Sequence, residues 1–139
     1  MPKVRRLVLA LLAVLLGGVS LQAGWASLGA MPAPRREGRT LLFHNAQGTV
    51  AVTVIAPEIL RIRFAPGPGL GRDHSYAVVK SDFGDPGASF DVGVAQSVVS
   101  TAALRVTVRH DPFRVSLATA GGHSLDEDDP LRGIGFAGT

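Results

Sequence analysis

Four consecutive acidic residues near the end of the chain are the strongest candidates for metal chemistry. Asp126-Glu127-Asp128-Asp129 offers carboxylate oxygens, which are the ligands that a hard cation such as Ca²⁺ prefers. The spacing of a known calcium loop is absent, however, and a run of like charges in a loop is typical of a solvated segment. We therefore predict no metal site in this sequence.

The four histidines are the next candidates for chemistry. His44, His74, His110 and His123 lie in separate turn-like segments and show none of the spacings that are typical of metal ligands. Any one of them could meet an Asp or a Ser in the folded chain, as in a hydrolase triad, but no local pattern indicates such a meeting. The sequence thus predicts no catalytic residue.

Two further patterns suggest ligand binding, but both favour a structural interpretation. Residues 133–138 (GIGFAG) match G-x-G-x-x-G, yet no helix is predicted after them and no βαβ unit surrounds them. Tyr76 has a ring that could stack on a sugar, but its position beside Ala77 and Val78 in a short apolar run favours packing. No cofactor is predicted, and the substrate-binding residues stay unknown.

The elements that must position any such residues are predicted to be strands. In residues 48–64 (GTVAVTVIAPEILRIRF), apolar residues alternate with others in two runs that Pro57-Glu58 joins. Such alternation is typical of half-buried strands, so this segment is predicted to form a β-hairpin with one apolar face. Residues 104–109 and 113–117 alternate in the same way around a turn at 110–112, which predicts a second hairpin.

Shorter strands are expected at 41–43, 76–79 and 98–100, and the segments at 66–73 and 82–89 are expected to be loops because of their Gly and Pro residues. Together these elements predict an all-β fold, an antiparallel β-sandwich. The residues expected in its core are Val50, Val52, Val54, Leu60, Ile62, Phe64, Leu104, Val106, Val108, Phe113, Val115 and Leu117. The arginines expected to face water, or to pack only their stems on the sheets, are Arg61, Arg63, Arg105, Arg109 and Arg114.

The first 26 residues resemble a secretory signal peptide. A basic start at 1–6 precedes an unbroken apolar run at 7–16, and small residues at Gly24 and Ala26 suit cleavage after Ala26, with Ala23 as the alternative. An uncleaved membrane anchor is the competing interpretation, since the apolar character continues weakly. We predict a signal-peptide helix, export to the periplasm or the medium, and no membrane association after cleavage.

A Pro/Arg-rich spacer is expected at 27–40, in which Arg35, Arg36 and Arg39 form a solvated basic cluster. The domain itself is expected at 41–139. The chain has no cysteine, so the domain must rest on its core without disulfides.

The charge of the chain excludes a nucleic-acid footprint. Three of its 14 Lys and Arg lie within the first six residues, and the remaining eleven balance the eleven Asp and Glu, all of which lie beyond residue 26. A domain without net charge has no broad basic surface for a polyanion. We therefore predict no nucleic-acid partner.

Several of these segments, in this order, resemble the N-terminal domain of glycoside hydrolase family 31, which includes α-glucosidases and α-xylosidases. The segments are 59–64 (ILRIRF), 75–78 (SYAV), Thr101, 104–108 (LRVTV), 111–115 (DPFRV), 121–122 (GG) and Leu125. The resemblance covers roughly residues 41–130. It implies a galactose mutarotase-like sandwich that precedes a catalytic (β/α)8 barrel, with an α-glycoside as the carbohydrate partner of the whole enzyme.

The catalytic residues of that family cannot be transferred to this sequence. Retaining glycosidases need two carboxyl groups, and the family carries them on its barrel, the nucleophile in a Trp-x-Asp-x-Asn-Glu type motif. The only tryptophan here is Trp25 and the only asparagine is Asn45, and neither stands in such a motif. We therefore expect an incomplete, inactive and non-catalytic sandwich; the alternatives are a stand-alone exported module that binds carbohydrate or one that binds a protein partner.

Overall fold

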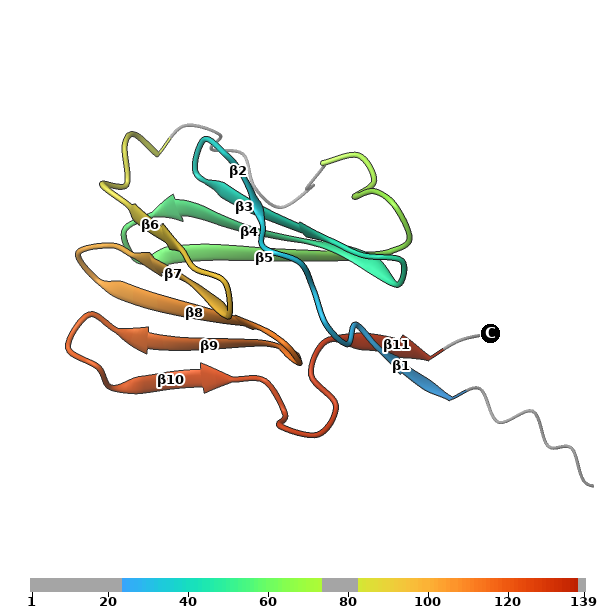
Figure 1. Ribbon diagram of the computed structural model, residues 1–139. Coiled ribbons are helices and arrows are strands. Elements are labelled where there is room, and N and C mark those ends of the chain that lie inside the picture. The colour runs from blue at the N-terminus through green and yellow to red at the C-terminus, as the bar shows by residue number, and fades with distance from the viewer. Residues whose placement is uncertain (1–23, 74–82, 138–139) are drawn as a thin grey trace, which may run out of the picture.

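The computed structural model describes residues 24–73 and 83–137, and every regular element among them is a β-strand (Figure 1). The first sheet runs in the order β2-β3-β4-β5; its strands are β2 (Arg35–Glu37), β3 (Thr40–His44), β4 (Gly48–Ala56) and β5 (Ile59–Pro66). The second runs in the order β10-β9-β8-β7-β6; its strands are β6 (Ser89–Val92), β7 (Gln96–Ser100), β8 (Leu104–His110), β9 (Phe113–Thr119) and β10 (Ser124–Glu127). A separate pair joins β1 (Trp25–Ser27) to β11 (Gly135–Ala137). All these pairings are antiparallel, which confirms the all-β prediction.

The first predicted hairpin is β4–β5. Val52 of β4 is fully buried and pairs with Ile62 of β5, so both side chains lie on the core side of the sheet. Ile62 is nevertheless 43% exposed, and its predicted place in the core is therefore wrong. The reason is that β5 is the outermost strand of its sheet, where only one flank is covered by a neighbouring strand.

The second predicted hairpin is β8–β9, in the expected register. Val106 and Val108 are buried while Arg105 and Arg109 are exposed, which is the alternation of a strand with one face in the core. In β9, the alternate positions that begin at Phe113 face the core in the same way. This agreement confirms the period-2 interpretation of both segments.

One hydrophobic core joins the two large sheets. Phe43 of β3 meets Phe113 of β9 edge to face, with ring centroids 5.1 Å apart, which is a favourable geometry for aromatic rings. The buried cluster combines predicted members with residues that the sequence analysis did not include. The additions are Leu28, Met31, Leu41, Phe43 and Val99. The two sheets therefore form a two-layered, sandwich-like arrangement (Figure 1).

The segment expected to be a spacer belongs to the fold. Leu28 and Met31 are buried in the core, and the backbone around them is held by bonds from Phe113 N–H to the Gly29 carbonyl (2.7 Å) and from Met31 N–H to the His110 carbonyl (2.9 Å). Residues 28–31 are therefore part of the packed domain, because Leu28 and Met31 fill space in its core.

Several predictions fall outside the described residues: the leader helix, the strand at 76–79, and the roles weighed for His74 and Tyr76. Residues 24–73 and 83–137 include no helix that could cross a bilayer.

Candidate functional site

A polar groove lies on the outer face of the five-stranded sheet. Strand pairing places Gln96 beside Arg109, and Arg109 beside Arg114. The adjacent row joins Thr107, Ser116 and Glu127. Directly opposite side chains on one sheet face have Cβ atoms roughly 5 Å apart, so these polar groups form one continuous surface. They line a hollow of about 340 Å³ that we call the outer-sheet groove.

Two side chains that line the outer-sheet groove make hydrogen bonds within the fold. The Arg114 guanidinium donates to the carbonyls of Phe113 (2.6 Å) and Pro130 (3.0 Å), while its Nε is buried without a hydrogen-bond partner. The Asp128 carboxylate accepts from Val115 N–H (2.8 Å), and the Asp128 N–H donates to the Val115 carbonyl (2.9 Å). These contacts hold the segment after β10 against β9.

The other groups in the outer-sheet groove have free hydrogen-bonding capacity. Among the described residues, the side chains of Gln96, Thr107 and Glu127 take part in no hydrogen bond or ion pair, and Arg109 uses only its Nε, toward the Pro112 carbonyl at 3.4 Å. An amide, a hydroxyl, a carboxylate and a guanidinium together supply both donors and acceptors. Such a surface suits a ligand rich in hydroxyl groups.

The charges of the outer-sheet groove also favour a neutral ligand. Arg109 and Arg114 are balanced by Glu127 and Asp128, so an anion or a cation gains little from the site as a whole. Only Glu127 is a free carboxylate, since Asp128 is bound to backbone. Glycoside hydrolysis needs a pair of carboxyl groups, so this arrangement can bind but does not supply that pair.

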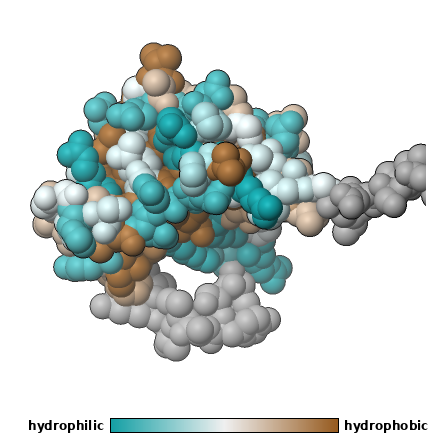
Figure 2. Space-filling model, turned by 90° about the horizontal axis from the view of Figure 1, so that it is seen from below, coloured by the Kyte–Doolittle hydropathy of each residue, from teal (hydrophilic) through white to brown (hydrophobic). Residues whose placement is uncertain are grey.

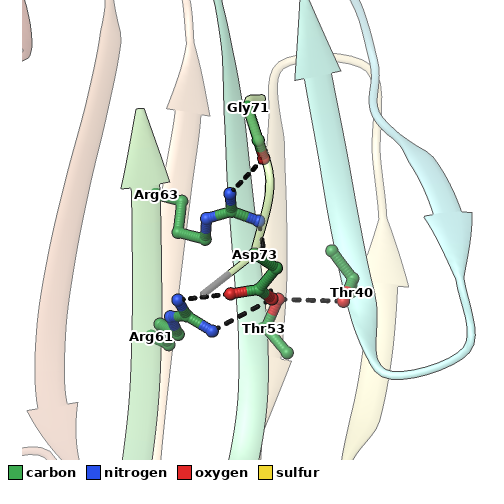
Figure 3. Close-up of polar contacts among 6 residues, drawn as sticks. All are labelled: Thr40, Thr53, Arg61, Arg63, Gly71 and Asp73. Carbon is green, nitrogen blue, oxygen red and sulfur yellow. Dashed lines mark hydrogen bonds and ion pairs between the residues drawn. The ribbon is translucent and has the colours of Figure 1, made fainter. Parts of the chain in front are cut away.

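The outer face of the four-stranded sheet is organised differently, as Figure 3 shows. Asp73 accepts from both Nη atoms of Arg61, at 2.6 and 3.1 Å, and its other ion pair is with Arg63 at 3.5 Å. Arg63 also donates to the Gly71 carbonyl (2.7 Å). The pKa of Asp73 is lowered, first by the hydrogen bond from Arg61 and then by the positive charges of the two arginines, although desolvation opposes them. We call this cluster the arginine–aspartate clamp; its charged groups satisfy one another.

A third group of polar residues surrounds a hollow of about 450 Å³ between the β2–β3 turn and residues 84–90. The Arg36 guanidinium lies 4.2 Å from the centroid of the Phe90 ring, Arg39 donates to the Gly84 carbonyl (3.0 Å), and Arg35 pairs with Glu37. Arg35, Arg36 and Arg39 are exposed, as the predicted solvated cluster requires, and Arg36 and Arg39 also connect β2 and its turn to the segment around β6. Phe90, which lines this hollow, therefore already has one ring face covered by the Arg36 guanidinium.

The acidic run has a structural role. Asp129 accepts from the N–H groups of Arg132 (2.7 Å) and Leu131 (2.9 Å), and these two backbone hydrogen bonds, against a desolvation effect, lower its pKa. In the described ranges no group of three His, Cys, Asp or Glu side chains could hold a metal ion.

The glycine-rich segment at 133–138 contributes a strand. Gly135 to Ala137 form β11, and no helix accompanies them among the described residues.

Sequence reasoning missed a buried serine–histidine pair. His110 Nε2 lies 2.9 Å from the hydroxyl of Ser97, and its Nδ1 donates to the Val94 carbonyl (2.9 Å). Ser97 is fully buried, and the third group is a carbonyl where a hydrolase triad has a carboxylate. The pair therefore satisfies polar groups inside the core.

Two other predicted candidates lie elsewhere. His44 contacts Thr49 Oγ1 (3.0 Å), and His123 lies exposed in the turn before β10.

The residues of the outer-sheet groove were also missed as a group. Arg109 and Arg114 were predicted to face away from the core, which is confirmed, but Gln96 and Glu127 come from segments with no such pattern. Only the pairing of β7 with β8 and of β9 with β10 brings them together. On the face seen in Figure 2, hydrophilic residues are interspersed with separate hydrophobic ones, so colour alone marks no single binding patch.

The chain matches no protein-family model and no curated protein. Among solved structures it is similar to the uncharacterized protein lmo2446 from Listeria monocytogenes EGD-e, with a TM-score of 0.60 and 15% sequence identity over 77% of this chain. The matched part is 10% of the Listeria protein, so this chain corresponds to a small share of that protein's length. The similarity shows a common fold. A second crystal structure of the Listeria protein contains α-D-glucose, β-D-glucose, magnesium and calcium.

Proposed function

We propose that this chain is an exported, non-catalytic β-sandwich domain of a glycoside hydrolase of the family 31 type, and that its outer-sheet groove contacts a neutral sugar. The observation that carries the proposal is the fold shared with one tenth of a protein that has been crystallised with glucose. A domain that forms a small part of a larger enzyme need not supply catalytic groups of its own. In the whole enzyme it would support a (β/α)8 barrel and the entry of substrate.

Two observations support the proposal. Among the segments that resemble family 31, residues 59–64 lie in β5, 104–108 in β8 and 113–115 in β9, and the alternation in these strands is what a galactose mutarotase-like sandwich would require. The groove offers neutral, mixed donors and acceptors, and the hydroxyl groups of a pyranose both donate and accept hydrogen bonds. The ligand chemistry and the fold therefore agree.

The gene sequence beyond the codon for Thr139 tests the first part of the proposal. We expect an in-frame continuation that encodes alternating strands and helices together with a Trp-x-Asp-x-Asn-Glu type motif. A stop codon at that point would instead favour the second candidate function, a stand-alone exported carbohydrate-binding module.

The free capacity of Gln96, Thr107 and Glu127 favours that second candidate, and binding itself can be measured. We expect methyl α-D-glucoside and maltose to shift amide resonances of β7, β8 and β9 around the outer-sheet groove. Affinity should be weak, with Kd on the order of 1 mM, because the groove adds few apolar contacts to its hydrogen bonds.

Glu127→Gln should reduce these shifts at a given sugar concentration by removing a charged acceptor. Glu58→Gln is the matched control, since Glu58 lies exposed in the β4–β5 turn, far along the chain from the groove. Equal shifts in both variants, or shifts centred on the arginine–aspartate clamp, would contradict this assignment of the groove.

A further inference from the structure

The first described strand lies across the expected boundary between leader and domain. β1 comprises Trp25, Ala26 and Ser27, and it pairs with β11 in the register Trp25↔Ala137, Ala26↔Phe136 and Ser27↔Gly135. Cleavage after Ala26, the preferred site from the sequence, would remove two of the three residues of this strand. β11 would then lose most of the one strand that pairs with it in the part of the chain that the structure describes.

Side-chain packing shows that Trp25 and Ala26 belong to the folded domain. A Cβ atom added to Gly135 would collide with the carbonyl oxygen of Ala26 and would lie 2.9 Å from two indole atoms of Trp25. β1 therefore lies directly on the bare backbone of Gly135. The next residue is Phe136, and its ring stacks on the ring of Phe64 in the four-stranded sheet, with centroids 6.0 Å apart. The β1–β11 pair is therefore attached to the rest of the fold.

The chain continues from β1 into the core without a break. Leu28, one residue after the strand, is 1% exposed, and its N–H donates to the Ile134 carbonyl at 3.2 Å. Its carbonyl and that of Ala30 accept from the side-chain amide of Asn45, at 2.7 and 2.8 Å. The domain therefore uses its chain from Trp25 onward.

The two cleavage sites also differ in the surroundings of the new α-amino group. Cleavage after Ala26 places an ammonium charge on Ser27, which is half-buried, paired with Gly135 and adjacent to the buried Leu28. Removing a charge from water without a partner is costly. Cleavage after Ala23 places the same charge on Gly24, which is exposed.

We propose that the leader is removed after Ala23, so that the mature protein begins at Gly24 and keeps β1 whole. Ala23 supplies the small residue that a signal peptidase requires immediately before the cut. The smaller residue at the −3 position favours Ala26 on sequence grounds, but a product that starts at Ser27 lacks residues that the fold packs. This inference rests on the proposed export of the chain.

The single tryptophan of the chain gives a direct test. The full chain is expressed in a bacterium, and the exported fraction is analysed by intact mass and N-terminal sequencing under denaturing conditions, which makes the result independent of folding. We expect a product that begins at Gly24 and retains tryptophan absorbance and fluorescence. A product that begins at Ser27 and contains no tryptophan would overturn the inference while leaving export intact.

Two substitutions sharpen the test. Ala23→Leu should abolish cleavage at this position, because a large residue does not fit the peptidase there, whereas Ala26→Leu should give a product that still begins at Gly24. If Ala26→Leu alone blocks processing, the site is Ala26 and the inference is wrong. A chain that keeps Met1 would contradict both the inference and the proposed export.

Discussion

The outer faces of the two sheets are built on the same alternation but use their arginines in opposite ways. In the arginine–aspartate clamp, Arg61 and Arg63 converge on Asp73 and hold residues 71–73 across the sheet. On the outer-sheet groove, Arg109 has no carboxylate partner, and Glu127 has no cation partner among the described residues. The first face uses its charges for its own structure, whereas the second leaves Arg109 and Glu127 accessible to a ligand. The comparison teaches that an outward-facing arginine indicates a binding surface only when nearby segments leave it unpaired.

The largest expected effect concerns the core that both faces depend on. Val106→Asp should abolish folding, because Val106 is 2% exposed and the new carboxylate would be buried without a partner. Such a charge costs several kcal/mol, whereas the total free energy of unfolding of a domain is about 5–15 kcal/mol. Thr107→Asp, one residue along on the outer face, should fold. Far-ultraviolet circular dichroism during thermal unfolding distinguishes the two, and a folded Val106→Asp protein would contradict the register of β8.

The clamp should respond to pH in a way that the groove does not. Because the pKa of Asp73 in the folded chain lies below its usual value of 3.8, the carboxylate stabilises the fold at every pH above that usual value. The contribution is lost as the pH falls through the lowered pKa. Asp73→Asn should therefore reduce the thermal midpoint at neutral pH, and by progressively less as the solution becomes acidic.

Arg63→Lys is a useful companion to that variant, because it keeps the charge and loses the planar geometry that reaches both Asp73 and Gly71. We expect a smaller decrease in the midpoint than for Asp73→Asn. An Asp73→Asn protein with an unchanged midpoint at neutral pH would show that the clamp does not stabilise the domain.

The groove should show the reverse behaviour, with an effect on binding and almost none on stability. Glu127→Gln should change the free energy of unfolding by no more than about 0.5 kcal/mol, as is usual for exposed substitutions, while it weakens sugar binding. Chemical denaturation of both proteins measures the first quantity. A clearly destabilised Glu127→Gln protein would mean that this carboxylate supports the fold, and the contrast between the two faces would disappear.

The smallest expected effect is on catalysis. The purified chain should hydrolyse aryl α-glycosides no faster than buffer does, because the groove supplies one free carboxylate where a retaining glycosidase needs two about 5 Å apart. Release of nitrophenol over long incubations measures this. Turnover that a single Asp or Glu substitution within residues 27–139 removes would make the chain an enzyme in its own right.

Those parts of the fold that rest on local alternation could be predicted from the sequence. The two hairpins followed from period-2 patterns, because the burial of one face imposes that period on each strand. The sequence also indicated that Arg61 and Arg109 face outward. It did not indicate that the first would find a carboxylate and the second would not, since that depends on where the loop at 66–73 lies.

Other features depended on contacts between distant parts of the chain. Leu28 and Met31 lie in a stretch with no strand pattern, and their backbone is hydrogen-bonded to Ile134, Asn45 and His110, which are distant in the sequence. Ile62 shows the opposite error: its local pattern is that of a core residue, but its strand has a neighbour on one side only. The candidate site could not be predicted, because its residues share a surface solely through strand pairing.

The pairing of β1 with β11 has a consequence for the order in which the domain assembles. The β4–β5 and β8–β9 hairpins join neighbouring segments and close short loops, so they can form soon after each segment is synthesised. β1 must wait for Gly135, because its partner strand is synthesised last among the described elements. Contacts at such long sequence separation are slow to form. Until then, β1 is open to proteases, and resistance to cleavage near Trp25 should appear only when β11 has joined the fold.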